Sequence, residues 1–256
     1  MRWLARRVRL AVARARFRVW AARLALALRR NGGRLALDAP HGAAFYEAPL
    51  IEATPDGGSG GTFTLRLGRD VRLGRRLVLE LWAGADSRLE IGDRTRLWSD
   101  VRVQLRRGAV CVGSDVQVRD RVQLKADGLL TVGDHGVLGR DSLLHCSERI
   151  DVGSHVGMGE RTSVIDSDHS PDGSERYYLD QPLRVTPVRV ARNVLISANV
   201  VLLRGSRLGA NSMVGAGSVV AAGDYPAGWL VAGIPARPRH ALGDRPTSAD
   251  PEPAAS

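Results

Sequence analysis

The stretch that decides the fold is residues 190–220, which read VARNVLISANVVLLRGSRLGANSMVGAGSVV. An aliphatic residue returns at every sixth position, and the members of this series are Val190, Ile196, Leu202, Leu208, Val214 and Val220. The fifth position of each hexad is small or β-branched: Val194, Val200, Ser206, Ser212 and Ser218. This period fits neither an α-helix of about 3.6 residues per turn nor the alternation of a single long strand. It predicts a chain that turns a corner every six residues.

Upstream, the same hexad recurs inside a longer repeat of 20 residues. Three triplets each advance by six within themselves and by 20 to the next: Val112, Val118 and Leu124; Val132, Leu138 and Leu144; Val152, Met158 and Val164. Three corners per coil, with extra residues bulging from one corner, account for both periods. Gly and Asn between the aliphatic positions suit the unusual backbone angles of tight corners. We therefore expect triangular coils that bury an aliphatic axis by stacking.

Composition supports this expectation and excludes several kinds of chemistry. The 256 residues suit one core or one long repeat, and aromatic residues make up only 5%, as a narrow axis requires. No stretch approaches about 18 uncharged apolar residues, so a membrane-spanning helix is not expected. Lys125 is the sole lysine, which excludes phosphate-loop and Schiff-base sites. Cys111 and Cys146 are too few for a disulfide framework or a four-cysteine zinc site, and predict reduced thiols in the cytoplasm.

The positive charge is concentrated at the N-terminus. Residues 1–37 hold eleven arginines and no acid, whereas the whole chain has a net charge of +10, so the rest is close to neutral. A basic pI that comes from one segment is not evidence of a nucleic-acid-binding body, and we expect no nucleic-acid partner. Residues 1–30 have helix-forming composition, and Asn31-Gly32-Gly33 is a plausible stop.

Several interpretations of this basic segment stay open. It could be a helix that is solvated or packs on a neighbouring subunit. It could also attach to anionic lipid through residues 1–34, because arginines beside Trp and Phe suit a membrane interface. Nucleic-acid binding and a cleaved targeting peptide are further alternatives. For the whole chain we predict a basic N-terminal helical segment and linker over 1–62, a coiled β domain over 63–242, and a disordered tail over 243–256, with the flexible linker itself at 53–61.

The most specific part of the pattern runs from Asn193-Val194-Leu195-Ile196-Ser197-Ala198-Asn199 through residues 214–220 to Ala232-Gly233-Ile234-Pro235-Ala236-Arg237. A proline-containing loop, Gly223-Asp224-Tyr225-Pro226, follows the last regular hexad. These features resemble the hexapeptide-repeat acyltransferases, and among them the sugar and polysaccharide O-acetyltransferases, over roughly residues 65–240. The resemblance implies an all-β fold, a left-handed parallel β-helix of hexapeptide repeats, with a homotrimer as the working assembly.

Residues 165–187 interrupt the hexads with a polar loop, a common location for a functional site. The loop begins Asp166-Ser167-Asp168-His169, similar to the Asp-x-Asp-His segment that carries the catalytic histidine of those O-acetyltransferases. The resemblance implies that His169 is the general base, since an imidazole titrates near neutral pH. Either Asp168 or Asp166 is expected to fix its tautomer and support the imidazolium.

The resemblance also implies acetyl-CoA as the donor, held between neighbouring subunits and used by direct transfer. A backbone N–H near Ala198 would stabilise the oxyanion, and Ala216 would leave room for the pantetheine arm. Arg237, with Arg239 as a second candidate, would contact the CoA phosphates. Two departures affect this cofactor contact: Leu195-Ile196-Ser197 stands where many relatives have Trp-Ile-Gly, and Ala221-Ala222 stands where Thr-Lys is common.

A metal site is not expected. Metal-binding relatives carry two histidines five residues apart, and none of the six histidines here has that spacing. His135 and His155 instead lie 20 residues apart at equivalent corners, and His145 is expected on the coil below Ile165.

The sequence thus predicts a cytoplasmic, acetyl-CoA-dependent O-acetyltransferase that modifies a sugar hydroxyl in cell-envelope or exopolysaccharide biosynthesis. An N-acetyltransferase on an amino sugar, and a non-catalytic β-helix scaffold, are the alternatives.

Overall fold

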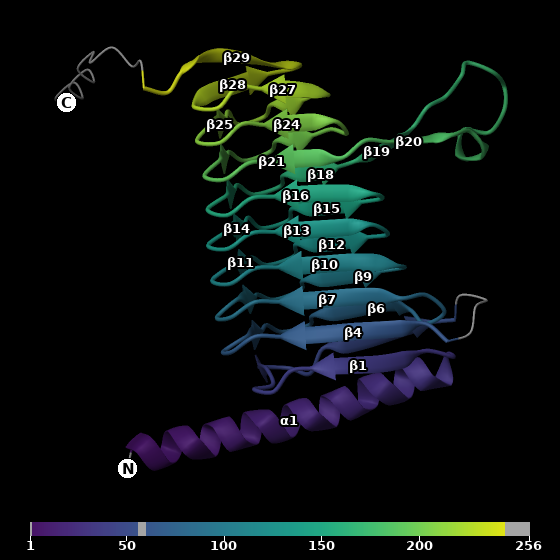
Figure 1. The fold of residues 1–256 in the computed structure, drawn as a ribbon, viewed down its shortest axis with the longest axis vertical. Coiled ribbons are helices and arrows are strands. Elements are labelled where there is room, and N and C mark those ends of the chain that lie inside the picture. The colour runs from purple at the N-terminus through teal and green to yellow at the C-terminus, as the bar shows by residue number, and fades with distance from the viewer. Residues whose placement is uncertain (1, 56–59, 244–256) are drawn as a thin grey trace, which may run out of the picture.

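The computed structural model describes residues 2–55 and 60–243 and shows a helix lying across the base of a tall stack of coils (Figure 1). Each regular coil contributes one strand to each of three parallel sheets. The first sheet contains β1 (Arg34–Asp38), β4 (Thr62–Leu67), β7 (Ser87–Ile91), β10 (Gly108–Val112), β13 (Leu129–Val132), β16 (Arg149–Val152), β21 (Val188–Val190), β24 (Ser206–Leu208) and β27 (Gly223–Tyr225).

The second sheet is the only one of the three that ends in an antiparallel strand. It contains β2 (Ala44–Phe45), β5 (Arg72–Leu73), β8 (Arg96–Leu97), β11 (Gln117–Val118), β14 (Val137–Leu138), β17 (Gly157–Met158), β22 (Leu195–Ile196), β25 (Met213–Val214), β28 (Trp229–Gly233) and the antiparallel β29 (Ala236–Ala241). The third sheet contains β3 (Leu50–Thr54), β6 (Val78–Trp82), β9 (Arg102–Leu105), β12 (Gln123–Ala126), β15 (Leu143–Cys146), β18 (Ser163–Ile165), β23 (Val201–Leu202) and β26 (Val219–Val220). The predicted β-helix is confirmed.

The hexad residues form the core, as the sequence predicted. All six members of the series from Val190 to Val220 are at most 3% exposed. In register, Val112 lies beside Val132, which lies beside Val152, so one aliphatic column runs up the axis. The small residues at the fifth positions hold the corners: Ser212 Oγ and Ser218 Oγ each donate a hydrogen bond of 2.6 Å to a carbonyl three residues earlier.

Two of the three corners place non-glycine residues in the left-handed region. We call the junction from first to second sheet the first corner, from second to third the second corner, and from third to first the third corner. Thirteen described non-glycine residues have positive φ, and all lie at the first or second corner. Only the upper coils use the expected asparagines, Asn193, Asn199 and Asn211, whereas the lower coils use Asp, Arg and His.

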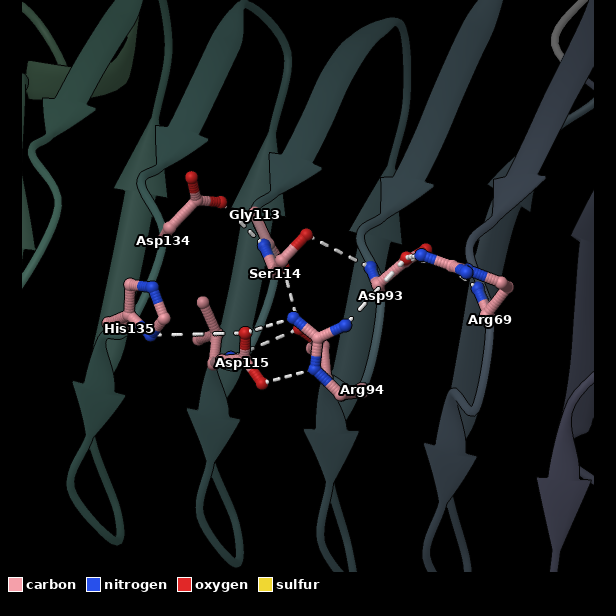
Figure 2. Close-up of polar contacts among 10 residues, drawn as sticks. Arg69, Asp93, Arg94, Gly113, Ser114, Asp115, Asp134 and His135 are labelled. Atoms are coloured by element: carbon pink, nitrogen blue, oxygen red, sulfur yellow. Dashed lines mark hydrogen bonds and ion pairs between the residues drawn. The ribbon is translucent and has the colours of Figure 1, made fainter.

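In the lower coils these corner residues alternate in charge from one coil to the next. Arg94 donates through Nε to Asp115 of the coil above at 2.7 Å, and its pair is bidentate, as Figure 2 shows. Arg76 and Asp100 form the same pair at the second corner. The hydrogen bond from Arg94 holds the pKa of the Asp115 carboxyl below its usual value. These pairs are exposed, so each adds little free energy, but the bidentate fork favours one corner geometry.

Helix α1 (Arg2–Arg30) packs on the first coil of its own chain. Its buried side chains, Phe17, Trp20, Ala21, Leu24 and Leu28, join the core, and Trp20 Nε1 donates to the Pro49 carbonyl at 2.9 Å. The helix ends at the predicted stop, where Gly32 has a φ of 84° and the Gly33 N–H donates to the Leu28 carbonyl at 2.9 Å. In the described part of the chain, no helix is long and apolar enough to cross a membrane.

The coiled domain begins earlier than the predicted boundary at residue 63. Residues 34–54 already form a complete coil, because β1 pairs with β4, β2 with β5 and β3 with β6. This coil escaped the sequence analysis because its inward series, Ala39, Phe45 and Ile51, keeps the six-residue spacing but has a small and an aromatic residue where the other coils have aliphatic ones. Of the predicted linker, residues 56–59 lie outside the described residues, and so does the predicted tail from residue 244 onward.

We expect Leu24→Ala to lower the free energy of unfolding by about 3 kcal/mol, because the change leaves a cavity between α1 and the first coil. Leu24 is 0% exposed, whereas Leu26 on the same helix is 48% exposed. The matched Leu26→Ala change should therefore cost less than about 0.5 kcal/mol. Urea unfolding followed by circular dichroism measures both, and equal losses would show that α1 does not pack on the core as described.

Candidate functional site

The polar loop predicted at 165–187 projects from the third corner. It leaves the stack after β18 and returns before β21, and its two sides pair as the antiparallel strands β19 (Ser167–His169) and β20 (Leu183–Val185). A single 3-10 turn, Tyr178–Asp180, lies in the loop between them. Figure 1 shows this hairpin, residues 166–187, extending sideways from the upper half of the stack.

His169 lies at the end of β19 and is exposed. Its ring meets Tyr178 edge to face, with 5.7 Å between ring centroids, and Tyr178 in turn contacts Tyr177 with 5.0 Å between centroids. Both tyrosines are at least half exposed. The hairpin therefore presents an imidazole next to an open aromatic surface. Sequence reasoning missed the two tyrosines, although adjacent exposed aromatics in a polar loop are a usable signal.

Asp166 is fully buried, and its carboxylate holds the base of the hairpin to the coil below. Oδ1 accepts a hydrogen bond from the Ser147 N–H at 2.7 Å. Oδ2 accepts from the N–H groups of Glu148 and Arg149, both at 2.8 Å. Burial, and then the charge of Asp166, raise the pKa of the adjacent Cys146 thiol to about 12. This thiol is therefore protonated at neutral pH and is not a nucleophile.

Asp168 is exposed and holds the hairpin from the other side. Its Oδ2 accepts a hydrogen bond from Arg204 Nε at 2.7 Å, and Arg204 belongs to the third corner of the next coil. Among the described residues, no hydrogen bond joins His169 to Asp166 or Asp168. Both carboxylates anchor the hairpin in this structure, and their expected role as partners of the imidazole stays a prediction.

The predicted donor-binding residues share another edge of the stack. Ala198 and Ala216 occupy the second corner on consecutive coils, where the Gly217 N–H donates to the Ala198 carbonyl at 3.0 Å. Ala198 is half-buried and Ala216 is exposed. Within the described residues, the Ala198 N–H donates to no backbone carbonyl, so it is available to an oxyanion. Beside them, Asn199 accepts a hydrogen bond from Arg161 Nε at 2.7 Å, and Ala216 lies between two glycines.

The two predicted arginines follow directly above this edge. Strand β29 folds back on β28, and Arg239 Nε donates to the Ala232 carbonyl at 3.0 Å. Ala232 lies over Gly215, one residue before Ala216. Arg237 donates to its neighbour's carbonyl, from Nη1 to Ala236, also at 3.0 Å. The Arg239 guanidinium therefore lies near the small-residue corner, and neither arginine has a carboxylate partner among the described residues.

One chain does not bring the two halves of the predicted site together. His169 extends from the third corner, whereas Ala198 and Ala216 lie at the second corner, and the third sheet lies between these edges. A site that uses both must therefore combine the hairpin of one copy with the second corner of another.

The other histidines lie as the sequence predicted. His135 and His155 stack at the first corner with 4.9 Å between ring centroids. His145 lies beside Ile165 in the third sheet, and its pKa is lowered by burial and then by the nearby charge of Lys125. A broad hollow of about 750 Å³ runs along the first sheet past Glu90 and Thr131, and none of the predicted site residues lines it.

Asp166→Asn and Asp168→Asn should separate the two anchors. We expect Asp166→Asn to lower the free energy of unfolding by about 2 kcal/mol, because an amide cannot accept all three buried N–H bonds. Asp168→Asn should cost less than about 1 kcal/mol, because its ion pair with Arg204 is exposed. Chemical unfolding of both variants beside the parent chain measures this difference. An Asp166→Asn variant as stable as the parent would rule out the proposed anchor.

Comparisons with known proteins found acetyltransferases that are similar to parts of this chain. No family model matches the chain. Over 99 residues, 38% of this chain, it is 32% identical to the probable acetyltransferase Rv3034c of Mycobacterium tuberculosis, and the match spans 33% of the length of that protein. A hexapeptide-repeat acetyltransferase of Vibrio cholerae, solved with acetyl-coenzyme A, is 33% identical and matches 44% of this chain and 61% of its own, with a TM-score of 0.41. A maltose O-acetyltransferase of Clostridium difficile is 16% identical over 68% of this chain and 67% of its own, with a TM-score of 0.40.

Proposed function

We propose that this chain, a member of the hexapeptide-repeat acetyltransferase family, moves an acetyl group from acetyl-CoA to a hydroxyl of a sugar. The pathway we propose is cell-envelope or exopolysaccharide biosynthesis. The observation that carries the proposal is the hairpin at the third corner, which leaves a regular hexapeptide stack and presents His169 beside the exposed ring of Tyr178. An exposed aromatic face next to a base suits a sugar, whose C–H face packs on rings while its hydroxyls are approached by the imidazole.

The reaction needs one base and no covalent acyl-enzyme. The neutral imidazole of His169 takes the proton of the acceptor hydroxyl as that oxygen attacks the thioester carbonyl. The tetrahedral intermediate collapses by breaking the carbon–sulfur bond, and the imidazolium returns the proton to the departing CoA sulfur. The products are the acetyl ester and free CoA thiol, so atoms and charge balance. The protonated, buried Cys146 takes no part.

The second corner supplies the donor half of the proposed site. The N–H of Ala198 would stabilise the oxyanion of the intermediate, where a well-placed donor contributes about 3 kcal/mol. Ala216 is exposed and short, so the edge beside it is open to the pantetheine arm. Arg237 and Arg239 at the top of the same edge would contact the CoA phosphates, for which a planar guanidinium is well suited.

We propose that the working assembly is a homotrimer. The two halves of the site lie on different edges of the stack, so each complete site needs two copies of the chain. The hairpin and the second sheet also expose large apolar side chains suited to a partner, among them Leu179, Leu183 and Leu195, each 47% to 51% exposed. A ring of three copies gives each hairpin a neighbouring corner and leaves no unmatched surface.

A cytoplasmic location fits the proposed donor and the two unpaired cysteines, Cys111 and Cys146.

A non-catalytic scaffold is the second candidate, and one observation favours it. Among the described residues His169 has no carboxylate partner, because both candidates are held by the anchors of the hairpin. N-acetyl transfer to an amino sugar would use the same residues and differ only in the acceptor. A panel of amine and hydroxyl acceptors separates these two chemistries.

His169→Ala should reduce acetyl transfer by about 10²- to 10⁴-fold, the usual contribution of a general base. Release of CoA thiol from acetyl-CoA, with a panel of oligosaccharides and nucleotide sugars, measures the rate. His41→Ala is the matched control, because His41 is also exposed but lies in the first coil. Unfolding midpoint and native mass should stay those of the parent in both variants. Full activity in His169→Ala would remove His169 from the mechanism, and a parent chain without activity on any acceptor would favour the scaffold.

Ala216→Leu should raise the KM for acetyl-CoA by about tenfold or more with a small change in stability, because the longer side chain would occupy the open edge. Ala210→Leu serves as the control, since Ala210 lies at the first corner, away from the proposed donor site. Steady-state kinetics over a range of acetyl-CoA concentrations gives both KM values. An unchanged KM in Ala216→Leu, or an equal rise in Ala210→Leu, would contradict the proposed path of the donor.

A further inference from the structure

Helix α1 has a second apolar face, opposite the one that packs on the first coil. Val12, Val19 and Leu26 recur every seven residues, so they form one stripe along the helix. They are 52%, 57% and 48% exposed, although they are large apolar side chains. Two apolar stripes on opposite sides of the helix leave two basic strips between them.

Arginines flank the exposed stripe on both sides. On a helix of about 100° per residue, Arg16, Arg23 and Arg30 fall on one side of the stripe, and Arg18 and Arg29 fall on the other. The Arg16 guanidinium reaches back to the first coil, where it donates to the Tyr46 carbonyl and lies over the Phe45 ring, so Arg23 and Arg30 form the outer strip on that side. All five are exposed. No acidic residue occurs in residues 1–37, so nothing within the helix neutralises them.

We propose that this outer face of α1, the stripe Val12, Val19 and Leu26 with its flanking arginines, binds an anionic lipid bilayer. An apolar stripe between two basic strips matches the interface of such a bilayer, where aliphatic side chains enter the acyl boundary and arginines reach the phosphates. The same charge makes a second copy of α1 an unfavourable occupant, because two such faces repel each other. The basic strips account for a preference for anionic over neutral lipid. The apolar stripe adds insertion into the acyl boundary, which a site that binds anions by charge alone does not need.

The placement of α1 sets the orientation of the molecule. The helix lies across the base of the stack, so its outer face looks away from all the coils (Figure 1). Bound in the plane of the interface, it would make the stack stand upright on the membrane. Strand β21 follows the hairpin and lies six steps above β1 in the first sheet. At about 4.8 Å per step this is a rise of about 29 Å, and the helix adds about 10 Å.

If the proposed function holds, the height of His169 above the membrane limits which acceptors it can reach. His169 would stand far outside the headgroup layer, so it would act on a sugar distant from any lipid carrier. The acceptor class we infer is therefore an extended lipid-linked oligosaccharide or polymer, not the sugar joined directly to the lipid.

Vesicle flotation of the full chain tests the docking surface without any acceptor. Phosphatidylcholine vesicles with about one third phosphatidylglycerol should carry the chain, and pure phosphatidylcholine should not, with binding that falls as salt rises. Val19→Asp with Leu26→Asp, and separately Arg23→Ala with Arg30→Ala, should each reduce binding at least tenfold. Arg107→Ala with Arg192→Ala is the matched control, since it removes the same charge from exposed positions on the stack and should bind like the parent.

Circular dichroism should show all these variants folded, because each altered side chain is exposed. His169→Ala should float like the parent, so loss of activity and loss of docking are distinguishable. Equal flotation by the stripe variants and the parent would overturn the proposal, and so would flotation that is equal on both kinds of vesicle. A chain that ignores vesicles and instead binds double-stranded DNA would assign the face to nucleic acid.

Neutron reflectometry on a supported bilayer of the same composition tests the orientation. An upright stack should give a protein layer about 50 Å thick, the rise of the nine strands of the first sheet plus the helix. A markedly thinner layer would show the stack lying on its side and would overturn the inferred height of the site.

Discussion

The fold depends on one constraint, the pairing of each strand with the equivalent strand of the coils above and below. Strands in this direction repeat at about 4.8 Å, so consecutive coils lie close together and the axis favours aliphatic and small side chains, with few aromatic residues such as Phe63. The same spacing brings equivalent corner residues into contact, which is why Arg94 reaches Asp115 and His135 lies against His155. The side-chain contacts at the corners therefore join different coils. The suitability of a corner side chain thus depends on the equivalent residue one coil above or below.

Much of this could be predicted from the sequence. The hexads identified the buried columns, because a six-residue period can be recognised in the sequence without knowing which residues are in contact. The first coil was missed because its series Ala39, Phe45 and Ile51 includes a small and an aromatic residue, so it does not stand out as an aliphatic repeat. The left-handed corners occupied by Asp, Arg and His were also missed. At these corners Asp and Arg form ion pairs with the coil above or below. A prediction from the backbone preference of each residue type alone favours Gly and Asn at left-handed positions and takes no account of such pairs.

The candidate site shows where sequence reasoning reaches its limit. The break in the hexads predicted a loop that begins at Asp166-Ser167-Asp168-His169, and in the structure this segment opens a hairpin beside the stack. The motif did not show that Asp166 accepts backbone N–H bonds whereas Asp168 pairs with an arginine. The three N–H groups that surround Asp166 come from residues 147–149, a turn on the coil below, and Arg204 comes from the coil above. A short motif holds no information about partners contributed by other coils, and still less about a second copy of the chain.

The last strand has a consequence for how long such a stack can grow. A sheet that ends in an uncovered parallel strand offers its free backbone groups to any similar strand, and stacked coils could polymerise end to end into fibres. The base is covered by α1. At the top of the second sheet, β29 runs in the opposite direction to the strands below, and it carries Arg237, Pro238 and Arg239. A proline has no N–H to offer a further strand, and the charged neighbours disfavour a dry contact. Helix α1 thus closes the base of the stack, and β29 closes the top of its second sheet.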